Sequence, residues 1–103
     1  MKDIRHFIDL LTSRTPEQFI EHLTKEPVIQ SEKDVLQSFR NFSLTDPVIN
    51  ALLYYMFFMD RQADWNKLSK IAQYFSEENI QTAAEALDTM IKLQQYEKQL
   101  DDE

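Results

Sequence analysis

The sequence predicts an all-α fold, a compact bundle of about five to six helices around a central apolar helix at approximately residues 46–59. Three observations lead to this prediction. The 103-residue chain contains no glycine and three prolines, so the tight turns that join β-strands lack their usual residue. Apolar residues recur at the three- and four-residue spacing of amphipathic helices, and capping signals separate these repeats. The 43% of apolar residues is enough for one buried core, which is typical of a single domain.

Two short helices are predicted at the start of the chain. The first rests on an apolar stripe at i, i+3, i+4 and i+7, and ends near Thr12. The second begins after Thr15, an N-cap, with Pro16 at the first helical position and Gln18 completing a capping box. The two stripes consist of Ile4, Phe7, Ile8 and Leu11, and of Phe19, Ile20 and Leu23.

A third helix is predicted after Pro27, because proline disfavours helical backbone at the residue before it. Ser31 is the expected N-cap of this helix. In a chain without glycine, Asn41 is the expected left-handed residue at its end. Its inward positions are Val35, Leu36 and Phe39.

The longest apolar run of the chain, residues 48–59, predicts the central helix. Twelve helical residues span only about 18 Å, whereas the hydrocarbon layer of a membrane is about 30 Å thick. Acidic residues, Asp46 and Asp60, flank the run on both sides. We therefore expect a buried core helix, and no membrane anchor in this chain. Asn50, the one strongly polar residue of the run, then needs a hydrogen-bond partner.

Two further helices complete the predicted bundle. The fifth covers roughly residues 65–77 and closes with Asn79 as a left-handed cap. The last starts at a capping box formed by Thr82 and Glu85. We expect a helical domain at residues 1–92, followed by a polar, acidic helix end or tail at residues 93–103. The inward residues are expected to be Trp65, Leu68, Ile71, Ala72 and Phe75 in the fifth helix, and Ala83, Ala86, Leu87, Met90, Ile91 and Leu93 in the last.

Composition narrows the class of function. The 11 basic and 18 acidic residues give a net charge of −7, so nucleic-acid binding needs a local cluster of Lys or Arg. The absence of cysteine excludes disulfides and thiolate metal sites, and the absence of glycine excludes Gly-rich phosphate loops. His6 and His22 lie on different predicted helices without metal-ligand spacing. We expect no metal, no cofactor and no catalytic residue, and a cytoplasmic location.

Four segments in a fixed order carry a family resemblance. They are TPEQFI at 15–20, DPVINALLYY at 46–55, KLSKIAQYF at 67–75 and NIQTAAEA at 79–86. Over residues 15–92 the chain resembles the DnaB/DnaD-like replication initiation (primosome) proteins of Gram-positive bacteria and their phages. Lys67 and Phe75 stand where the family pattern has tyrosine and tryptophan. The motif positions are Ile49, Asn50, Tyr55, Lys67, Ile71, Phe75, Thr82 and Glu85.

The resemblance implies a non-catalytic component of the primosome that initiates or restarts DNA replication. Proteins of this family bind a helicase loader or an initiator, self-associate and contact DNA, which would place this chain at the nucleoid. The residues alone leave an alternative open, a helical protein–protein interaction module unrelated to replication.

Two surfaces are candidate binding sites. Cations and aromatic residues gather at the start of the fifth helix, an arrangement that suits binding of single-stranded DNA. The alternative is that the aromatic residues belong to the core and the lysines form an ordinary solvated face. Apolar residues beyond Ile91 form either a partner-binding face or a frayed helix end. The candidate nucleic-acid contacts are Arg61, Trp65, Lys67 and Lys70, with Phe75 nearby, and the candidate partner face is Leu93, Tyr96 and Leu100.

Overall fold

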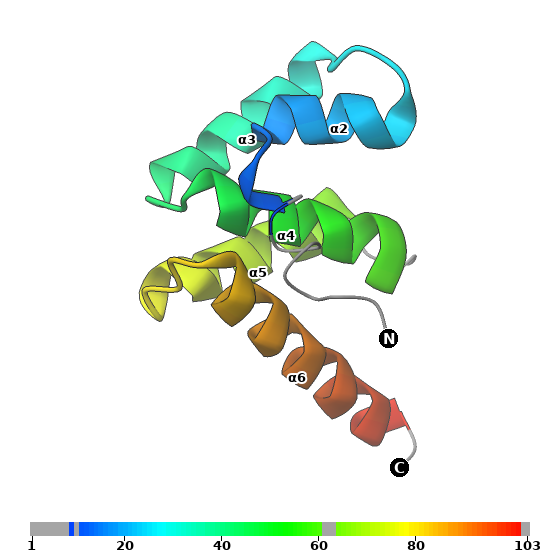
Figure 1. The fold of residues 1–103 in the computed structure, drawn as a ribbon. Helices are drawn as coiled ribbons and strands as arrows, with labels where there is room; N and C mark the ends of the chain where they lie inside the picture. Colours follow the sequence, from blue (N-terminus) through cyan, green and yellow to red (C-terminus); the bar gives the residue numbers. More distant parts are fainter. Residues whose placement is uncertain (1–8, 10, 61–63, 102–103) are drawn as a thin grey trace.

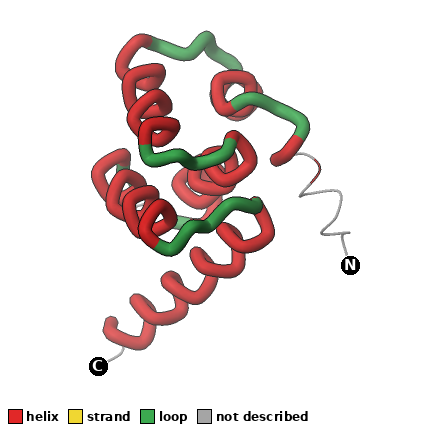
Figure 2. The backbone as a smooth tube through the Cα atoms, turned by 90° about the vertical axis from the view of Figure 1, so that its left-hand side faces the viewer, coloured by secondary structure: helices red, strands yellow, loops and turns green. Residues whose placement is uncertain are grey.

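The computed structural model describes the backbone of residues 9, 11–60 and 64–101 and the side chains as far as Gln95. Within these ranges all regular structure is helical, as Figures 1 and 2 show, so the all-α prediction is confirmed. Of the predicted first helix, Leu11 is fully buried and Ser13 N–H donates to Asp9 O at 3.0 Å, so helical backbone ends at Thr12. The remaining stripe residues of that helix, Ile4, Phe7 and Ile8, lie outside the described residues.

Helix α2 (Pro16–Thr24) begins with the predicted capping box. Gln18 N–H donates to Thr15 Oγ1 at 3.2 Å, and Thr15 N–H donates to Gln18 Oε1 at 3.0 Å. The helix ends at Lys25, whose φ of 62° lies in the left-handed region. Phe19 and Ile20 are buried against α4, as their spacing predicts.

Helix α3 (Gln30–Asn41) corrects two predicted caps. Its N-cap is Ile29 and not Ser31, because the Glu32 carboxylate accepts the backbone N–H of Ile29 at 3.0 Å and fixes an earlier start. Asn41 is still helical, and Ser43, with a φ of 66°, takes the left-handed conformation expected of Asn41.

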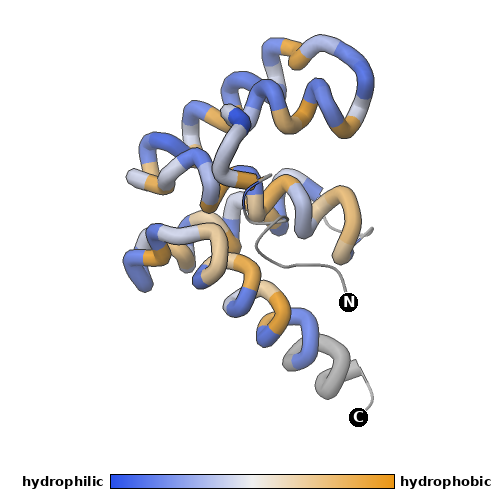
Figure 3. Tube along the Cα trace, in the orientation of Figure 1, coloured by the Kyte–Doolittle hydropathy of each residue, from blue (hydrophilic) through white to orange (hydrophobic). Residues whose placement is uncertain are grey.

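Helix α4 (Asp46–Tyr54) is the central element and packs against α2, α3, α5 and α6. It continues into a π-helical turn, η1 (Tyr55–Met59), in which Asp60 N–H donates to Tyr55 O at 2.9 Å. Figure 3 shows hydrophobic positions concentrated along this segment. Residues 48–53 and Tyr55 are buried, but Phe58 is 54% exposed. The expected burial of the run is therefore wrong for Phe58, which lies in the π-turn, whereas Met56, Phe57 and Met59 are partly buried against the core.

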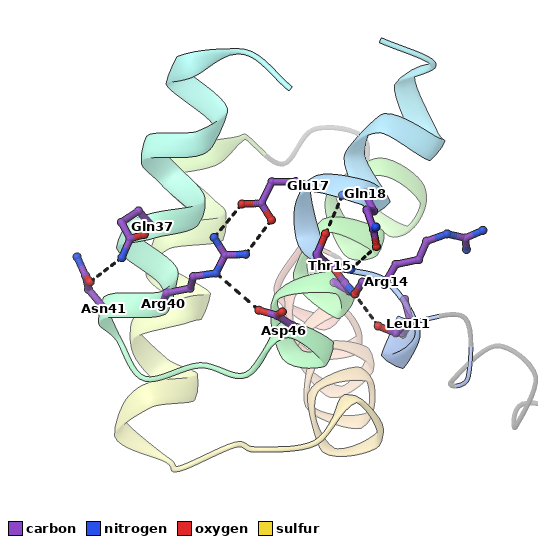
Figure 4. A network of polar contacts seen from close by, with 10 residues as sticks. Leu11, Arg14, Thr15, Glu17, Gln18, Gln37, Arg40, Asn41 and Asp46 are labelled. Carbon is purple, nitrogen blue, oxygen red and sulfur yellow. Dashed lines mark hydrogen bonds and ion pairs between the residues drawn. The ribbon is translucent and has the colours of Figure 1, made fainter. Parts of the chain in front are cut away.

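Two polar networks tie the first half of the chain together. The Asn50 side chain, fully buried on α4, donates from Nδ2 to Leu11 O at 2.7 Å and to Arg14 O at 2.8 Å. Figure 4 shows the second network, in which Arg40 of α3 lies between Glu17 of α2 and Asp46 of α4. The bidentate hydrogen bonds from Arg40 lower the pKa of Glu17 below its usual value. The first network holds residues 11–14 on α4, and the second joins α2 and α3 to α4.

Helix α5 (Trp65–Glu77) has the predicted bounds, and Asp64 caps it by accepting the backbone N–H of Lys67 at 2.9 Å. Helix α6 (Ala83–Asp101) starts after Thr82 and runs diagonally away from the other helices in Figures 1 and 2. Asn79, with a φ of 57°, is the predicted left-handed residue between them. Ile91 is 44% exposed, so its expected burial is wrong. The buried residues of these helices are Leu68, Ile71, Ala72, Phe75, Ala83, Ala86, Leu87 and Met90.

Candidate functional site between helices α5 and α6

An open groove of about 280 Å³ lies between α5 and α6. Four of its lining residues come from α5 at the spacing i, i+3, i+4 and i+7, which places them on one face of that helix. The fifth comes from α6 and is half-buried against the core. The lining residues are Lys67, Lys70, Ile71, Tyr74 and Leu93.

The groove combines an apolar base with polar side chains at its edge. Ile71 is 7% exposed and Leu93 is half-buried, so these two side chains form the base. Tyr74 is 42% exposed, and Lys70 is exposed one turn before it. An aromatic ring and a cation therefore stand side by side at the rim, on a chain whose net charge is −7.

Lys67 occupies the other end of the groove and belongs to a cluster with η1 and the residue after it. Its Nζ lies 2.5 Å from Asp60 Oδ2 and 5.7 Å from the centre of the Tyr55 ring. The Tyr55 hydroxyl donates to the same carboxylate oxygen at 3.3 Å. Gln94 of α6 donates from Nε2 to Met59 O at 2.8 Å, which fixes α6 against the same turn. The cluster thus joins the groove to the end of the central helix.

The family-motif positions divide between the core and the groove. Ile49 and Phe75 are fully buried, and Asn50 makes the two hydrogen bonds described above. The predicted Thr82 cap at the start of α6 is present, because Glu85 N–H donates to Thr82 Oγ1 at 3.2 Å. The Glu85 carboxylate accepts from the Thr82 hydroxyl at 3.0 Å, a side-chain bond in place of the backbone bond that a capping box requires. The remaining motif positions, Tyr55, Lys67 and Ile71, form or adjoin the groove.

The candidate contact residues are only partly brought together. Lys67 and Lys70 line the groove, whereas Trp65 packs half-buried against the core. Arg61 lies outside the described residues. Leu93, proposed for the partner face, lies in the same groove, while the side chains of Tyr96 and Leu100 lie outside the description.

Sequence reasoning missed two residues of this site, Tyr74 and Asp60. Tyr74 follows Lys70 by four residues, so the helical period could have placed it on the lysine face. Asp60 precedes Lys67 by seven residues across a loop, and no local periodicity links two such positions.

The described residues show neither a metal site nor a membrane-spanning helix. Among them, no group of three or more His, Asp or Glu residues is arranged to hold a metal ion. None of the described helices has both the length and the apolar character needed to cross a membrane.

The fold and the groove define a small helical domain that carries a mixed apolar and cationic surface between α5 and α6. A family model for replication initiation and membrane attachment proteins matches residues 14–89. The chain belongs to this family, which is the DnaB/DnaD-like group that the sequence motifs resemble. No curated protein and no solved structure gives a significant match to the chain.

Proposed function

We propose that this domain serves replication initiation without catalysis, by holding a short stretch of single-stranded DNA in the groove between α5 and α6. Membership of the replication initiation family supports the general role. The observation that carries the DNA proposal is the placement of Lys70 and the exposed Tyr74, four residues apart on α5, in the lining of one groove. A base stacks on the tyrosine, and the adjacent phosphate pairs with the lysine. The domain then acts in the cytoplasm, at the nucleoid.

Charge determines the expected strength of this binding. The net charge of −7 repels a phosphate backbone, and few lysines reach the groove. Binding should therefore be weak and measurable only at low salt. For single strands the slope of log K against log salt is about −0.7 per phosphate contact, so one or two contacts give a slope between about −0.7 and −1.4.

Fluorescence anisotropy with labelled oligo(dT) of about 15 nucleotides tests the proposal, since a length of this order covers the sites of single-strand binders. Tyr74→Ala should weaken binding by roughly 5-fold or more, because stacking on one aromatic ring contributes about 1–3 kcal/mol. Lys70→Glu should weaken binding and lower the salt slope. Lys92→Glu is the matched control, because its side chain is 72% exposed on α6 and does not line the groove.

Two results would reject this function. One is a parent protein that shows no salt-dependent binding at about 20 mM salt, where electrostatic attraction is strongest. The other is a Lys92→Glu variant that loses as much affinity as Lys70→Glu, because the effect would then come from net charge alone. Melting temperatures of all variants should stay close to that of the parent, since Lys70, Tyr74 and Lys92 are exposed.

A partner protein is the second candidate ligand, on a different surface. Phe58 is 54% exposed and its ring centre lies 5.0 Å from that of Tyr54. Exposed aromatic side chains of this kind often anchor protein interfaces. Phe58→Ser should weaken the complex of this protein with the purified helicase loader or initiator. Unchanged complex formation with both purified proteins would exclude this surface.

A further inference from the structure

Lys67, one of the two lysines that line the groove, is paired with the carboxylate of Asp60. Lys67 Nζ contacts Asp60 Oδ2 at 2.5 Å, and its ammonium lies 5.7 Å from the centre of the Tyr55 ring. The Tyr55 hydroxyl donates to the same Asp60 oxygen. Because Tyr55 is fully buried, the pair rests on a rigid base.

The ion pair on α6 provides an exposed reference for this contact. Lys92 and Asp88 of α6 also form a pair, at 3.0 Å, but their side chains are 72% and 66% exposed. For Lys67 and Asp60 the corresponding fractions are 30% and 18%. Water screens the first pair strongly and the second much less. A phosphate therefore displaces Asp88 from Lys92 far more easily than it displaces Asp60 from Lys67.

We infer that Asp60 is a positioning residue that sets the affinity of the groove for single-stranded DNA by holding Lys67 away from the DNA phosphates. The inference rests on the proposed function of the groove. While Lys67 stays on Asp60, Lys70 supplies the cation for a phosphate. Removing the Asp60 charge adds Lys67 to the site and raises the number of phosphate contacts by one.

The measurement is a double-mutant cycle in DNA affinity and in its salt slope. Asp60→Asn keeps the shape of the side chain and an oxygen for the Tyr55 hydroxyl, but removes the charge that holds Lys67. This variant should bind oligo(dT) about 3-fold to 10-fold more tightly at low salt, with a slope steeper by about 0.7. Lys67→Gln alone should stay within about 2-fold of the parent, because that lysine is already occupied. In the Asp60→Asn background, Lys67→Gln should abolish the gain.

Asp88→Asn is the matched control. It makes the same change in net charge and frees a lysine, Lys92, which does not line the groove. Equal gains from Asp60→Asn and Asp88→Asn would overturn the inference, because the effect would follow net charge. A loss from Lys67→Gln as large as that from Lys70→Glu would also overturn it, because Lys67 would then already be engaging DNA.

A DNA-independent measurement separates failure of the inference from failure of the proposed function. An ammonium held by a carboxylate exchanges its protons slowly, so NMR should detect the Lys67 ammonium in the parent and lose it in Asp60→Asn. If that signal is absent from the parent, Asp60 does not hold Lys67 and the inference falls. If the signal behaves as expected but no variant binds DNA, the groove is not a DNA site and both proposals fail. If the parent and Lys70→Glu behave as proposed and Asp60→Asn changes nothing, the inference alone fails.

Discussion

Replacing Asn50 by alanine should destabilise the fold more than its small volume suggests. The side chain is fully buried on α4 and donates two hydrogen bonds, to Leu11 O and to Arg14 O. Leu11 lies in the helical segment before α2 and Arg14 in the link that follows it, so the Asn50 amide fixes both to α4. Asn50→Ala removes the donor of both hydrogen bonds, and the alanine side chain cannot replace it.

The magnitude follows from the burial of each acceptor. A buried polar group left without its partner costs about 1–3 kcal/mol, and the bond to Leu11 O is buried while that to Arg14 O is partly buried. Asn50 Oδ1 accepts no hydrogen bond within the described structure, so its removal returns part of this cost. We expect a net loss of about 2–4 kcal/mol, which is a large share of the stability of a domain of this size. The melting temperature should fall by roughly 10–25 °C.

Urea denaturation followed by circular dichroism measures the loss, with Asn66→Ala as the control. Asn66 is exposed on α5, so its replacement should change stability by less than about 0.5 kcal/mol. Asn50→Asp has the same shape but no donor when ionised, and should be less stable than Asn50→Ala near neutral pH. A loss below about 1 kcal/mol for Asn50→Ala, or an Asn50→Asp variant as stable as the parent, would refute this account of the buried amide.

Three further outcomes follow from single residues. Because Arg40 lowers the pKa of Glu17 in the folded state, this carboxylate stabilises the fold above its unfolded pKa near 4.5, and the contribution is lost as pH falls through the lowered value. Glu17→Gln should therefore reduce the acid-induced loss in free energy of unfolding, measured by urea titration between about pH 6 and pH 3. The reduction should be less than about 1 kcal/mol, because both side chains of the pair are about a third exposed. An unchanged pH profile would contradict this expectation. Ser43→Gly should raise the free energy of unfolding by about 0.5–1 kcal/mol, because glycine adopts a φ of 66° without strain. Ser38→Gly inside α3 should lower the free energy of unfolding by a similar amount. Changes of the same sign in the two variants would reject this reasoning. Leu52→Ala, at a fully buried position of α4, should cost about 2–5 kcal/mol in the same assay, and a cost below 1 would place Leu52 outside the core.

The helices were predictable because their signals are local. The capping box of α2, the Asp64 cap of α5 and the Thr82 cap of α6 each involve two residues three positions apart. The caps of α3 were harder, because Ile29 is not a usual N-cap residue and acts here through its backbone. Local patterns also cannot reveal which neighbouring helix covers a given face. Phe58 and Ile91 belong to apolar stripes and yet remain exposed. Phe58 lies in the π-turn, and Ile91 follows the fully buried Met90 on the solvent side of α6.

Only part of the candidate site could be predicted from the sequence, because only part of it depends on local spacing. Lys67 and Lys70 are three residues apart on one helix, and their shared face follows from the helical period. The position of Leu93 in the groove depends on how α6 packs beside α5. The partner of Lys67, Asp60, depends on the loop that follows the π-turn. Tertiary packing, and not residue spacing, therefore determines that Asp60 pairs with Lys67.

The family-motif positions separate into two physical roles that different measurements distinguish. Positions in the core or at a helix cap determine the stability of the fold, so their substitution should lower the melting temperature and leave the DNA salt slope of the folded protein unchanged. Lys67, the charged motif position on the groove, should behave differently. Because Asp60 holds this lysine, its substitution should change the DNA salt slope only when the Asp60 charge has been removed. Tyr55 joins the two sets, because its buried ring carries the ion pair of Lys67 and Asp60. Tyr55→Phe keeps the ring and removes the hydroxyl that helps to hold Asp60, so it is the one substitution at a motif position that should weaken both the fold and the hold on Lys67.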